Sequence, residues 1–144
     1  MLHLCDVDKD NFQECITLDV NEEQRSFVAP NIRSLAQAYV FRDVAKVFAL
    51  YEEGTMVGFA MLHVDHTEKE YWLWRFMIDR RFQHMGYGRE ALGKIIGYFN
   101  SIGAKTVKLS FEPENHIAEK LYSSCGFYRN GKENDGEIVM QLDL

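Results

Sequence analysis

The sequence predicts an α/β (α+β) protein whose central sheet is mixed and mainly antiparallel, with about six to seven strands and about four flanking helices. Two β-rich segments, 44–51 and 56–64, are joined by the short turn Glu52-Glu-Gly-Thr55, which indicates a hairpin. A third apolar and aromatic segment, 70–79, follows another polar turn and continues the antiparallel order. Strand and helix patterns alternate after it, which predicts one parallel pair.

The N-terminal part predicts a strand and two helices. Residues 2–6 alternate between apolar and polar side chains, as a half-buried strand does. The segment 21–31 is a polar, acidic connection in which Pro30 limits any helical turn, and Ser34 is the expected N-cap of the second helix. The helical spacing comes from Phe12, Cys15 and Ile16 in the first helix and from Leu35, Ala38 and Tyr39 in the second.

The C-terminal half predicts helices and strands in alternation. A glycine-bearing turn at 81–89 precedes a run of apolar residues with helical spacing. A strand at 106–111, a helix at 115–124 and a final strand near 137–142 complete the order. The helical spacing after the turn comes from Leu92, Ile95, Ile96 and Phe99.

Length, composition and charge narrow the class of protein. The 144 residues, 47% of them hydrophobic, are expected to form one domain over 1–144. No apolar run approaches the roughly 20 residues of a membrane span, and no secretory signal is expected from the acidic start of the chain. The net charge of −6 argues against nucleic acid as a partner and suits a cationic one. With 3 cysteines, which cannot all pair, reduced thiols in a cytoplasmic protein are expected.

The turn Arg81-Phe-Gln-His-Met-Gly-Tyr-Gly-Arg89 predicts a phosphate site. A turn between a strand and a helix leaves backbone N–H groups free at the positive end of the helix dipole, where an anion is stabilised. Gly86 and Gly88 have no Cβ, so a diphosphate can approach the main chain and positive φ costs little. Arg81, Gln83 and Arg89 are candidate side-chain donors.

Other readings of this turn are weaker. Gly86-Tyr-Gly88-Arg-Glu-Ala91 matches the dinucleotide fingerprint, and Glu112 lies near the end of the next strand. A dinucleotide fold, however, places its first glycine directly after the first strand of a parallel sheet, whereas the polar stretch 79–85 and three antiparallel strands come first here. The P-loop pattern is absent because no Gly-Lys-Ser/Thr follows. A glycine turn that only starts the helix is the structural alternative.

Two motifs together resemble the GNAT N-acetyltransferase superfamily. The stretch Gln83-x-x-Gly86-x-Gly88 resembles its acetyl-CoA-binding motif, and the segment 115–127 resembles its next motif, N-x-x-A-x-x-L-Y-x-x-x-G-F. Their order, separated by a helix and a strand, and the order of elements along nearly the whole chain also match that family. Within it, the bacterial spermine/spermidine acetyltransferase branch is the most similar, on the segments 21–24, 27–29, 34–39 and 72–79.

The resemblance implies acetyl-CoA as co-substrate, no metal, and a pantetheine arm that enters between the fourth and fifth strands, usually beside a bulge. The backbone from Phe76 to Ile78 would then bond the pantetheine, and the backbone from His84 to Arg89 would hold the pyrophosphate. The expected coenzyme-binding residues are Phe76, Met77, Ile78, Gln83, His84, Met85, Gly86, Tyr87, Gly88, Arg89, Asn115 and Ala118.

The resemblance also identifies Tyr122 as the general acid that protonates the departing thiolate. Asn115, Ala118 and Tyr122 share one face of the later helix, so Tyr122 need not be a core residue. A phenol with a pKa near about 10 can donate to a thiolate whose parent thiol has a pKa of about 8.5. A packing tyrosine with a satisfied hydroxyl is the alternative. The core face of this helix is expected to carry Ile117, Leu121 and Cys125.

The proton acceptor is not identified by the sequence. Where a related spermidine acetyltransferase has a fourth-strand acid, this chain has Trp74, so Glu22, Glu23 and Glu112 are the substitutes. The residues proposed to bind substrate are Glu22, Glu23, Trp74 and Glu112, with Trp72 and Tyr39 as further aromatic walls. Arg75 is awkward for a cation, so it is expected to face away or to pair with Glu22 or Glu23.

These residues predict an enzyme that transfers acetyl from acetyl-CoA to a primary amine by direct attack in a ternary complex. The preferred acceptor is a polyamine such as spermine or spermidine. The alternatives are acetylation of a protein N-terminus, a lysine or another small amine, and an acyl-CoA sensor without turnover. A homodimer would fit the family. His63-Val-Asp-His66 is read as a polar turn and not a metal site, and Cys125 is a poor candidate nucleophile because no base follows it.

Overall fold

A computed structural model describes all of residues 1–144 and confirms the predicted fold class. A single seven-stranded sheet is flanked by four α-helices and two short 3-10 turns, η1 and η2. None of the helices is long and apolar enough to cross a membrane. The elements are β1 (Leu2–Asp6), α1 (Phe12–Thr17), η1 (Glu22–Gln24), α2 (Asn31–Val40), β2 (Ala45–Glu52), β3 (Thr55–Asp65), β4 (Glu70–Ile78), η2 (Arg80–Phe82), α3 (Tyr87–Ser101), β5 (Thr106–Phe111), α4 (His116–Ser124), β6 (Tyr128–Asn134) and β7 (Glu137–Asp143).

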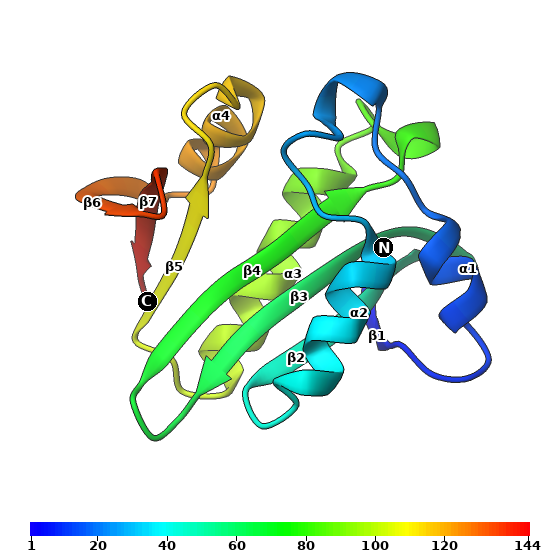
Figure 1. Ribbon diagram of the computed structural model, residues 1–144, viewed down its shortest axis with the longest axis horizontal. Helices are drawn as coiled ribbons and strands as arrows, with labels where there is room; N and C mark the ends of the chain where they lie inside the picture. Colours follow the sequence, from blue (N-terminus) through cyan, green and yellow to red (C-terminus); the bar gives the residue numbers. More distant parts are fainter.

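The sheet has the order β1-β2-β3-β4-β5-β7-β6. Every neighbouring pair is antiparallel except β4 and β5, which confirms the predicted parallel pair. These two strands are paired only at Trp72 and Lys108. Beyond that position they separate toward their C-terminal ends, and Figure 1 shows the opening between β4 and the unit formed by β5, β7 and α4. The edge of β4 is therefore without a partner strand along its second half.

Helices cover both faces of the sheet, with α1 and α2 on one side and α3 on the other (Figure 1). The larger core lies under α3, where Leu92, Ile95 and Phe99 pack against strand residues such as Leu109. A smaller core lies under α1 and α2. Its buried members are Cys15, Leu18, Val20, Ala49, Met56, Phe59, Met61 and Met77.

A β-bulge in β4 changes which side chains face each core. Met61 pairs with Arg75 while Leu62 pairs with Leu73, so Trp74 is one extra residue on β4. Trp74 packs against the smaller core, and Arg75 next to it reaches α2, so two consecutive side chains lie on the same face of the sheet. The alternation is then reversed for the residues that follow. Phe76 and Ile78 consequently pack against the core under α3, and Met77 packs against the core under α1 and α2.

The structure corrects two expectations about the elements. Strand β6 was not predicted, because its side chains are mostly exposed and Gly131, with φ of 85°, interrupts it. Helix α2 begins at Asn31, and its N-cap is Pro30, not Ser34. The Pro30 carbonyl accepts the backbone N–H groups of Arg33 and Ser34 at 3.0 and 3.2 Å. Ser34 therefore lies inside the helix, where its buried hydroxyl has no hydrogen-bond partner.

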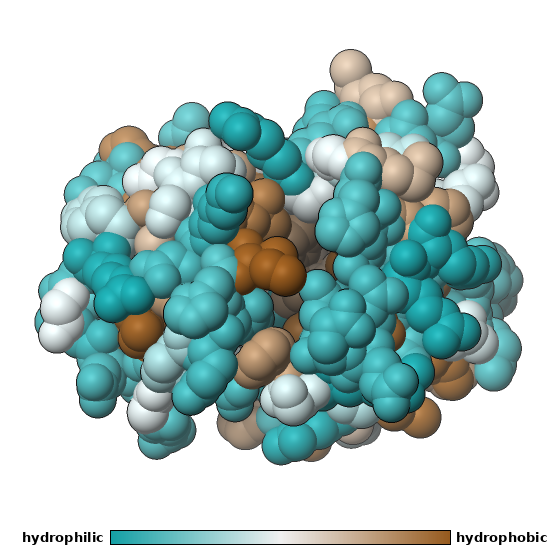
Figure 2. Space-filling model, turned by 90° about the horizontal axis from the view of Figure 1, so that it is seen from above, coloured by the Kyte–Doolittle hydropathy of each residue, from teal (hydrophilic) through white to brown (hydrophobic).

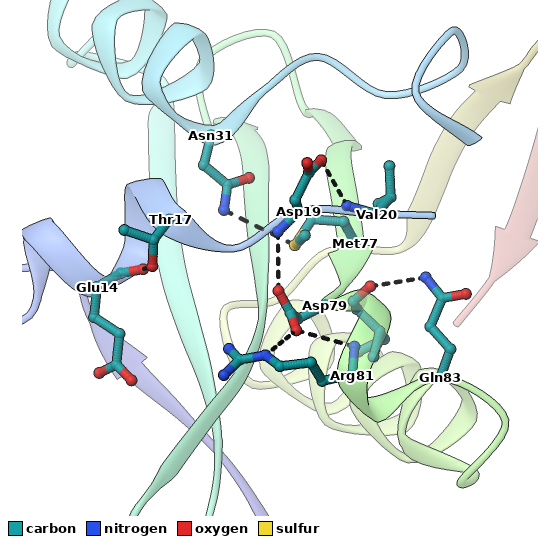
Figure 3. A network of polar contacts seen from close by, with 10 residues as sticks. Glu14, Thr17, Asp19, Val20, Asn31, Met77, Asp79, Arg81 and Gln83 are labelled. Carbon is teal, nitrogen blue, oxygen red and sulfur yellow. Dashed lines mark hydrogen bonds and ion pairs between the residues drawn. The ribbon is translucent and has the colours of Figure 1, made fainter. Parts of the chain in front are cut away.

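The buried carboxylate of Asp79 anchors the end of β4 (Figure 3). It accepts the backbone N–H of Asp19 at 2.9 Å and the Nε of Arg81 at 2.7 Å. The backbone N–H of Arg81 also donates to it at 3.1 Å. Burial alone would raise the pKa of Asp79, but the bonds from Arg81 and from the Asp19 backbone outweigh burial and lower this pKa below its ordinary value.

Asp79→Asn is expected to reduce the free energy of unfolding by about 2 kcal/mol, because Arg81 loses its carboxylate partner. The lowered pKa of Asp79 means that this contribution is full above about pH 4 and is lost as the pH falls through the folded-state pKa. Urea unfolding at about pH 6 and about pH 3 should show a gap between the two proteins that narrows in acid. The matched control is Asp6→Asn, because the ion pair of Asp6 with Lys46 is exposed and should contribute little.

Candidate functional site

The opening between β4 and β5 leads into a cleft of about 850 Å³. Its walls come from the segment between α1 and α2, from the second half of β4, from the turn before α3, from α4 and from the β6–β7 turn. Seen from above in Figure 2, this side of the molecule is hollowed at its centre, and hydrophobic side chains show between mostly polar rims. Its lining extends from Gly88 at the N-terminus of α3 to Arg33 on α2, which covers the opposite face of the sheet.

The turn before α3 has the backbone that a phosphate site requires. His84 and Gly86 have φ of 62° and 83°, so the chain curls around the start of the helix. Gly86 is the N-cap, and no side chain caps the first turn, which leaves its N–H groups without partners inside the helix. The only acidic side chain of that turn, Glu90, is turned away and accepts the backbone N–H of Leu2 at 2.7 Å. These features fit an anionic group such as a pyrophosphate.

Gln83 holds this turn in place. Its Nε2 donates to the side-chain oxygen of Gln24 at 2.8 Å and to the carbonyl of Ile78 at 3.0 Å. Its Oε1 accepts the side-chain Nδ2 of Asn21 at 2.8 Å. Both donors of Gln83 are therefore occupied by the protein. Gln83 was predicted to be a free side-chain donor, but in this structure its amide instead links the turn to η1.

The other predicted coenzyme residues divide into two groups. Met85 and Arg89 are exposed and do not line the cleft, and Arg89 donates to the Ser124 carbonyl at 3.3 Å. Arg81 was an expected phosphate donor, but its Nε is occupied by Asp79. The residues that do line the cleft are Phe76, Met77, Ile78, Gln83, His84, Gly86, Tyr87, Gly88, Asn115 and Ala118.

The second half of β4 has an edge without a partner strand. Because β4 and β5 pair only at Trp72 and Lys108, the β4 backbone near Phe76 and Met77 has no strand beside it on that edge. Unpaired backbone N–H and C=O groups need another partner. The carbonyl of Ile78 is already occupied by Gln83. A ligand in extended conformation that offers amide groups fits the rest of this edge.

Tyr122 lines the cleft from α4, and its ring packs edge-on against Phe127 with ring centres 6.1 Å apart. Burial, reinforced by the negative charge of Glu137, raises the pKa of Tyr122 to about 12. The hydroxyl therefore stays protonated throughout the physiological pH range and can act as a donor, not as a base.

The faces of α4 are only partly as expected. Asn115 is the N-cap, and its side chain accepts the Ala118 backbone N–H at 3.3 Å. Leu121 packs against the core under α3 and lies near Gly88, as a core residue should. Ile117 was expected in the core, but its side chain is 67% exposed and lies at the cleft. Helix α4 has only 9 residues and lies beyond the C-terminal end of β5, so its first turn extends past the core.

The predicted substrate residues are not all brought together. Glu23, Trp74 and Glu112 line the cleft, whereas Glu22 does not. Trp74 is also a packing residue, since its ring centre lies 5.9 Å from that of Phe41 and 6.1 Å from that of His63. The further aromatic walls, Tyr39 and Trp72, are outside the cleft as well.

Arg75 faces the cleft without a carboxylate partner. Its Nη2 donates to the Gln37 side chain at 3.0 Å, so the expected pairing with Glu22 or Glu23 is wrong. Burial lowers the pKa of Arg75, and so does the neighbouring charge of Arg33 on α2, while Glu137 opposes this effect. Arg33 and Arg75 both line the cleft, and neither forms an ion pair. This wall of the cleft is therefore positively charged.

Sequence reasoning missed Glu137, Ser110 and Asp135, all of which line the cleft. The Ser110 hydroxyl donates to Glu137 Oε1 at 2.7 Å. No motif marks these positions, because each stands at the edge of an ordinary strand or turn.

The histidine and cysteine residues do not form a metal site. No group of three or more His, Cys, Asp or Glu side chains is placed to hold a metal ion. His66 contacts the Tyr71 hydroxyl at 2.8 Å. Cys15 is buried, which raises the pKa of its thiol to about 11. The three cysteines are unpaired.

Comparison with known proteins decides the family. Residues 8–127 match the acetyltransferase (GNAT) family. The chain belongs to the GNAT acetyltransferase family. Members of this family use acetyl-CoA, and the uncapped turn, the cleft and the free edge of β4 agree with that co-substrate.

Relatives within the GNAT family have different named acceptors. The chain is 31% identical to the spermine/spermidine N(1)-acetyltransferase of Bacillus subtilis, over 96% of this chain and 95% of that protein. It is 32% identical to the ribosomal protein bS18-alanine N-acetyltransferase of Haemophilus ducreyi, over 53% of this chain and 51% of that protein. The crystal structure of spermidine N-acetyltransferase from Vibrio cholerae, in complex with CoA and spermine, covers 97% of this chain and 92% of its own chain at 17% identity and a TM-score of 0.76. This last likeness supports the fold.

Gly86→Glu is expected to weaken acetyl-CoA binding about 100-fold or more, because a side chain at φ of 83° strains the turn and adds a negative charge where the pyrophosphate belongs. Gly103→Glu is the matched control, since Gly103 has φ of 87°, similar open space around its Cβ and a position at the other end of α3. Titration calorimetry with acetyl-CoA measures both variants. Equal loss of affinity in both would assign the effect to backbone strain alone, and unchanged affinity of Gly86→Glu would reject the phosphate site.

Proposed function

We propose that residues 1–144 act as one domain that transfers the acetyl group of acetyl-CoA to a primary amine. The observation that carries this proposal is the continuity of the cleft. It connects the uncapped start of α3, where phosphates are stabilised, to the hydroxyl of Tyr122, where a thiolate would leave. The parting of β4 and β5 lies between these two points.

Each part of the cleft has a separate task in this reaction. The turn from His84 to Gly88 holds the phosphates through backbone N–H groups. The free edge of β4 near Phe76 and Met77 bonds the extended arm and so aligns the thioester. Tyr122 donates its proton to the leaving sulfur, and its raised pKa keeps that proton in place until the thiolate forms. The apolar walls exclude water, which would otherwise compete with the amine.

The preferred acceptor is a polyamine such as spermine or spermidine. Relatives with this named acceptor support the assignment along nearly the whole chain. The cleft also carries side chains that attract ammonium groups, and these are Glu23, Glu112, Asp135 and Glu137. The net charge of −6 favours the approach of cations.

A second candidate acceptor is lysine or another amine that carries a carboxylate. Arg33 and Arg75 favour it, because a guanidinium in the cleft without a carboxylate partner is a natural binding group for one, and that of Arg75 is half-buried. A protein N-terminus is a related candidate, which the bS18-alanine relative supports over half of the chain. A sensor that binds acetyl-CoA without turnover differs from all of these in showing no thiol release.

Tyr122→Phe should lower kcat about 100-fold, because the ring and its packing remain while the proton for the leaving sulfur is lost. The affinity for acetyl-CoA should stay within about twofold of the wild-type value. Thiol release measures kcat, and calorimetry measures binding. Since the pKa of Tyr122 is raised to about 12, wild-type kcat should not fall between about pH 8 and about pH 10 through ionisation of this hydroxyl. Equal turnover in the two proteins would remove Tyr122 from the catalytic step.

Two matched pairs of amines separate the candidate acceptors. Cadaverine and lysine differ by a carboxylate, as do putrescine and ornithine, and spermidine extends the series on the polyamine side. A polyamine enzyme should turn over spermidine and the diamines at least about 10-fold more efficiently than the amino acids. If Arg75 repels the diamines, Arg75→Gln should raise kcat/KM for them. If Arg75 binds the carboxylate of the acceptor, the same variant should lower kcat/KM for the amino acids about 10-fold or more. Arg42→Gln is the control, because Arg42 is an exposed arginine that packs on Tyr39 outside the cleft.

A further inference from the structure

Glu137 is the first residue of β7 and lies beside the point where β4 and β5 have parted. In the antiparallel pairing of β5 with β7, Phe111 is opposite Ile138 and Ser110 is opposite Val139. Glu137 and Val139 therefore share a face of the sheet with Ser110. On that face Glu137 is half-buried, lines the cleft and accepts the Ser110 hydroxyl at 2.7 Å. One carboxylate oxygen is held, and the other remains available to the cleft.

The charge of Glu137 acts on two groups that stand on different walls of the cleft. It raises the pKa of Tyr122 on α4, and it raises that of Arg75 on β4. Of the carboxylates that line the cleft, Glu137 is the one whose charge acts on Tyr122. Glu137 lines the same cleft as the hydroxyl of Tyr122 at the leaving-group end and the guanidinium of Arg75 at the acceptor end. An amine that attacks a thioester beside Tyr122 would enter this same cleft.

We propose that Glu137 is the base that takes a proton from the acceptor amine. The proposal rests on the transfer reaction stated above and deepens it, because neither strand β4 nor any motif of the sequence supplies this group. An alkyl amine with a pKa near about 10.4 enters mostly as an ammonium ion, which has no free electron pair. The Glu137 carboxylate lines the cleft that this amine would enter, and Ser110 fixes its orientation as a positioning residue.

The proton and electron balance of the step is complete with the groups present. Glu137 removes one proton from the ammonium and becomes a carboxylic acid, and the freed nitrogen pair forms the C–N bond at the thioester carbon. The C–S bond breaks, and the sulfur takes the proton of Tyr122. The second proton of the nitrogen returns to the Tyr122 oxygen. Glu137 then releases its proton to solvent, so one proton leaves the protein for each amide formed.

The surroundings of Glu137 suit this task. Charged groups on several elements line the cleft with it, and these are Arg75 and Arg33 on the acceptor wall, Glu112 after β5 and Asp135 in the β6–β7 turn. Arg75 and Arg33 form no ion pair, so the acceptor wall is positively charged. The same positive charge disfavours an ammonium ion at that wall and so assists its loss of a proton.

Glu137→Gln tests the proposal, because the amide keeps an oxygen for the Ser110 hydroxyl and removes the base. At about pH 7 the variant should lose about 100-fold in kcat/KM for the amine while its acetyl-CoA affinity, measured by calorimetry, stays unchanged. The loss should shrink as the pH rises toward about 10, because the amine then loses its proton to solvent without help. Ser110→Ala should show a smaller loss with the same pH trend. Glu133→Gln, an exposed position on β6 outside the cleft, is the matched control and should keep wild-type rates.

The outcomes separate this proposal from the transfer reaction itself. A thermal denaturation midpoint equal to that of the wild type establishes that Glu137→Gln is folded. Wild-type turnover that persists in Glu137→Gln, or a loss that is the same at every pH, overturns the role of Glu137 and leaves the transferase intact. Absence of thiol release from the wild-type protein with every primary amine overturns the transfer reaction and this inference together.

Discussion

The parting of β4 and β5 is the constraint on which the rest of the structure depends. A parallel pair that stayed hydrogen-bonded to its end would satisfy the backbone of β4 and leave no cleft. Here the pair has one pairing position, so the polar edge of β4 must find other partners beyond Trp72. Strand β5 is instead held by β7 along its whole length, which turns it away with α4 as one unit (Figure 1). The cleft is therefore a product of strand pairing and not of a gap in side-chain packing.

The cleft can stay open because its two rims are fixed separately. The buried carboxylate of Asp79 ties the end of β4 to the segment after α1 (Figure 3). Gln83 ties the following turn to Asn21 and to Gln24 of η1. The bulge at Trp74 places that residue and Arg75 on the acceptor side, while Phe76 and Ile78 pack under α3. On the other rim, the β5–β7 register brings Ser110 and Glu137 together. Both rims are thus preorganised before any ligand binds, which is what an oriented transfer requires.

Local patterns were enough to predict most of the fold. The hairpin, the third antiparallel strand and the parallel pair follow from alternation, turn residues and the rule for crossover connections. Strand β6 was missed because an exposed strand has no alternation of its own, and its pairing depends on β7. Ser34 was taken for a helix cap because its residue type suits that position, but the carbonyl of Pro30 starts the helix one turn earlier.

The parts of the candidate site that are formed by the local backbone could be predicted from the sequence. The parts that depend on contacts between residues far apart in the sequence could not. The turn at Gly86 has the expected conformation because glycine and the following helix determine it locally. Gln83 has a different partner from the expected one, since Asn21 and Gln24 are 62 and 59 residues away in the sequence. Glu137 could not be identified, because its place in the cleft beside Ser110 depends on the register of β5 with β7. Tertiary contacts of this kind leave no local signal.

The acceptor is decided by the balance of charge along the cleft, and this balance differs between its two ends. At the Tyr122 end, Glu137 carries a negative charge that would act on any amine whatever the rest of the acceptor carries. At the α2 wall, Arg33 and Arg75 repel a second ammonium group and attract a carboxylate. A polyamine would therefore extend away from α2 toward Glu23 or Glu112, whereas an amino acid would extend toward it. The reacting nitrogen would occupy the same place in both cases, so the rest of the acceptor, and not the chemistry of transfer, would distinguish the two substrate classes.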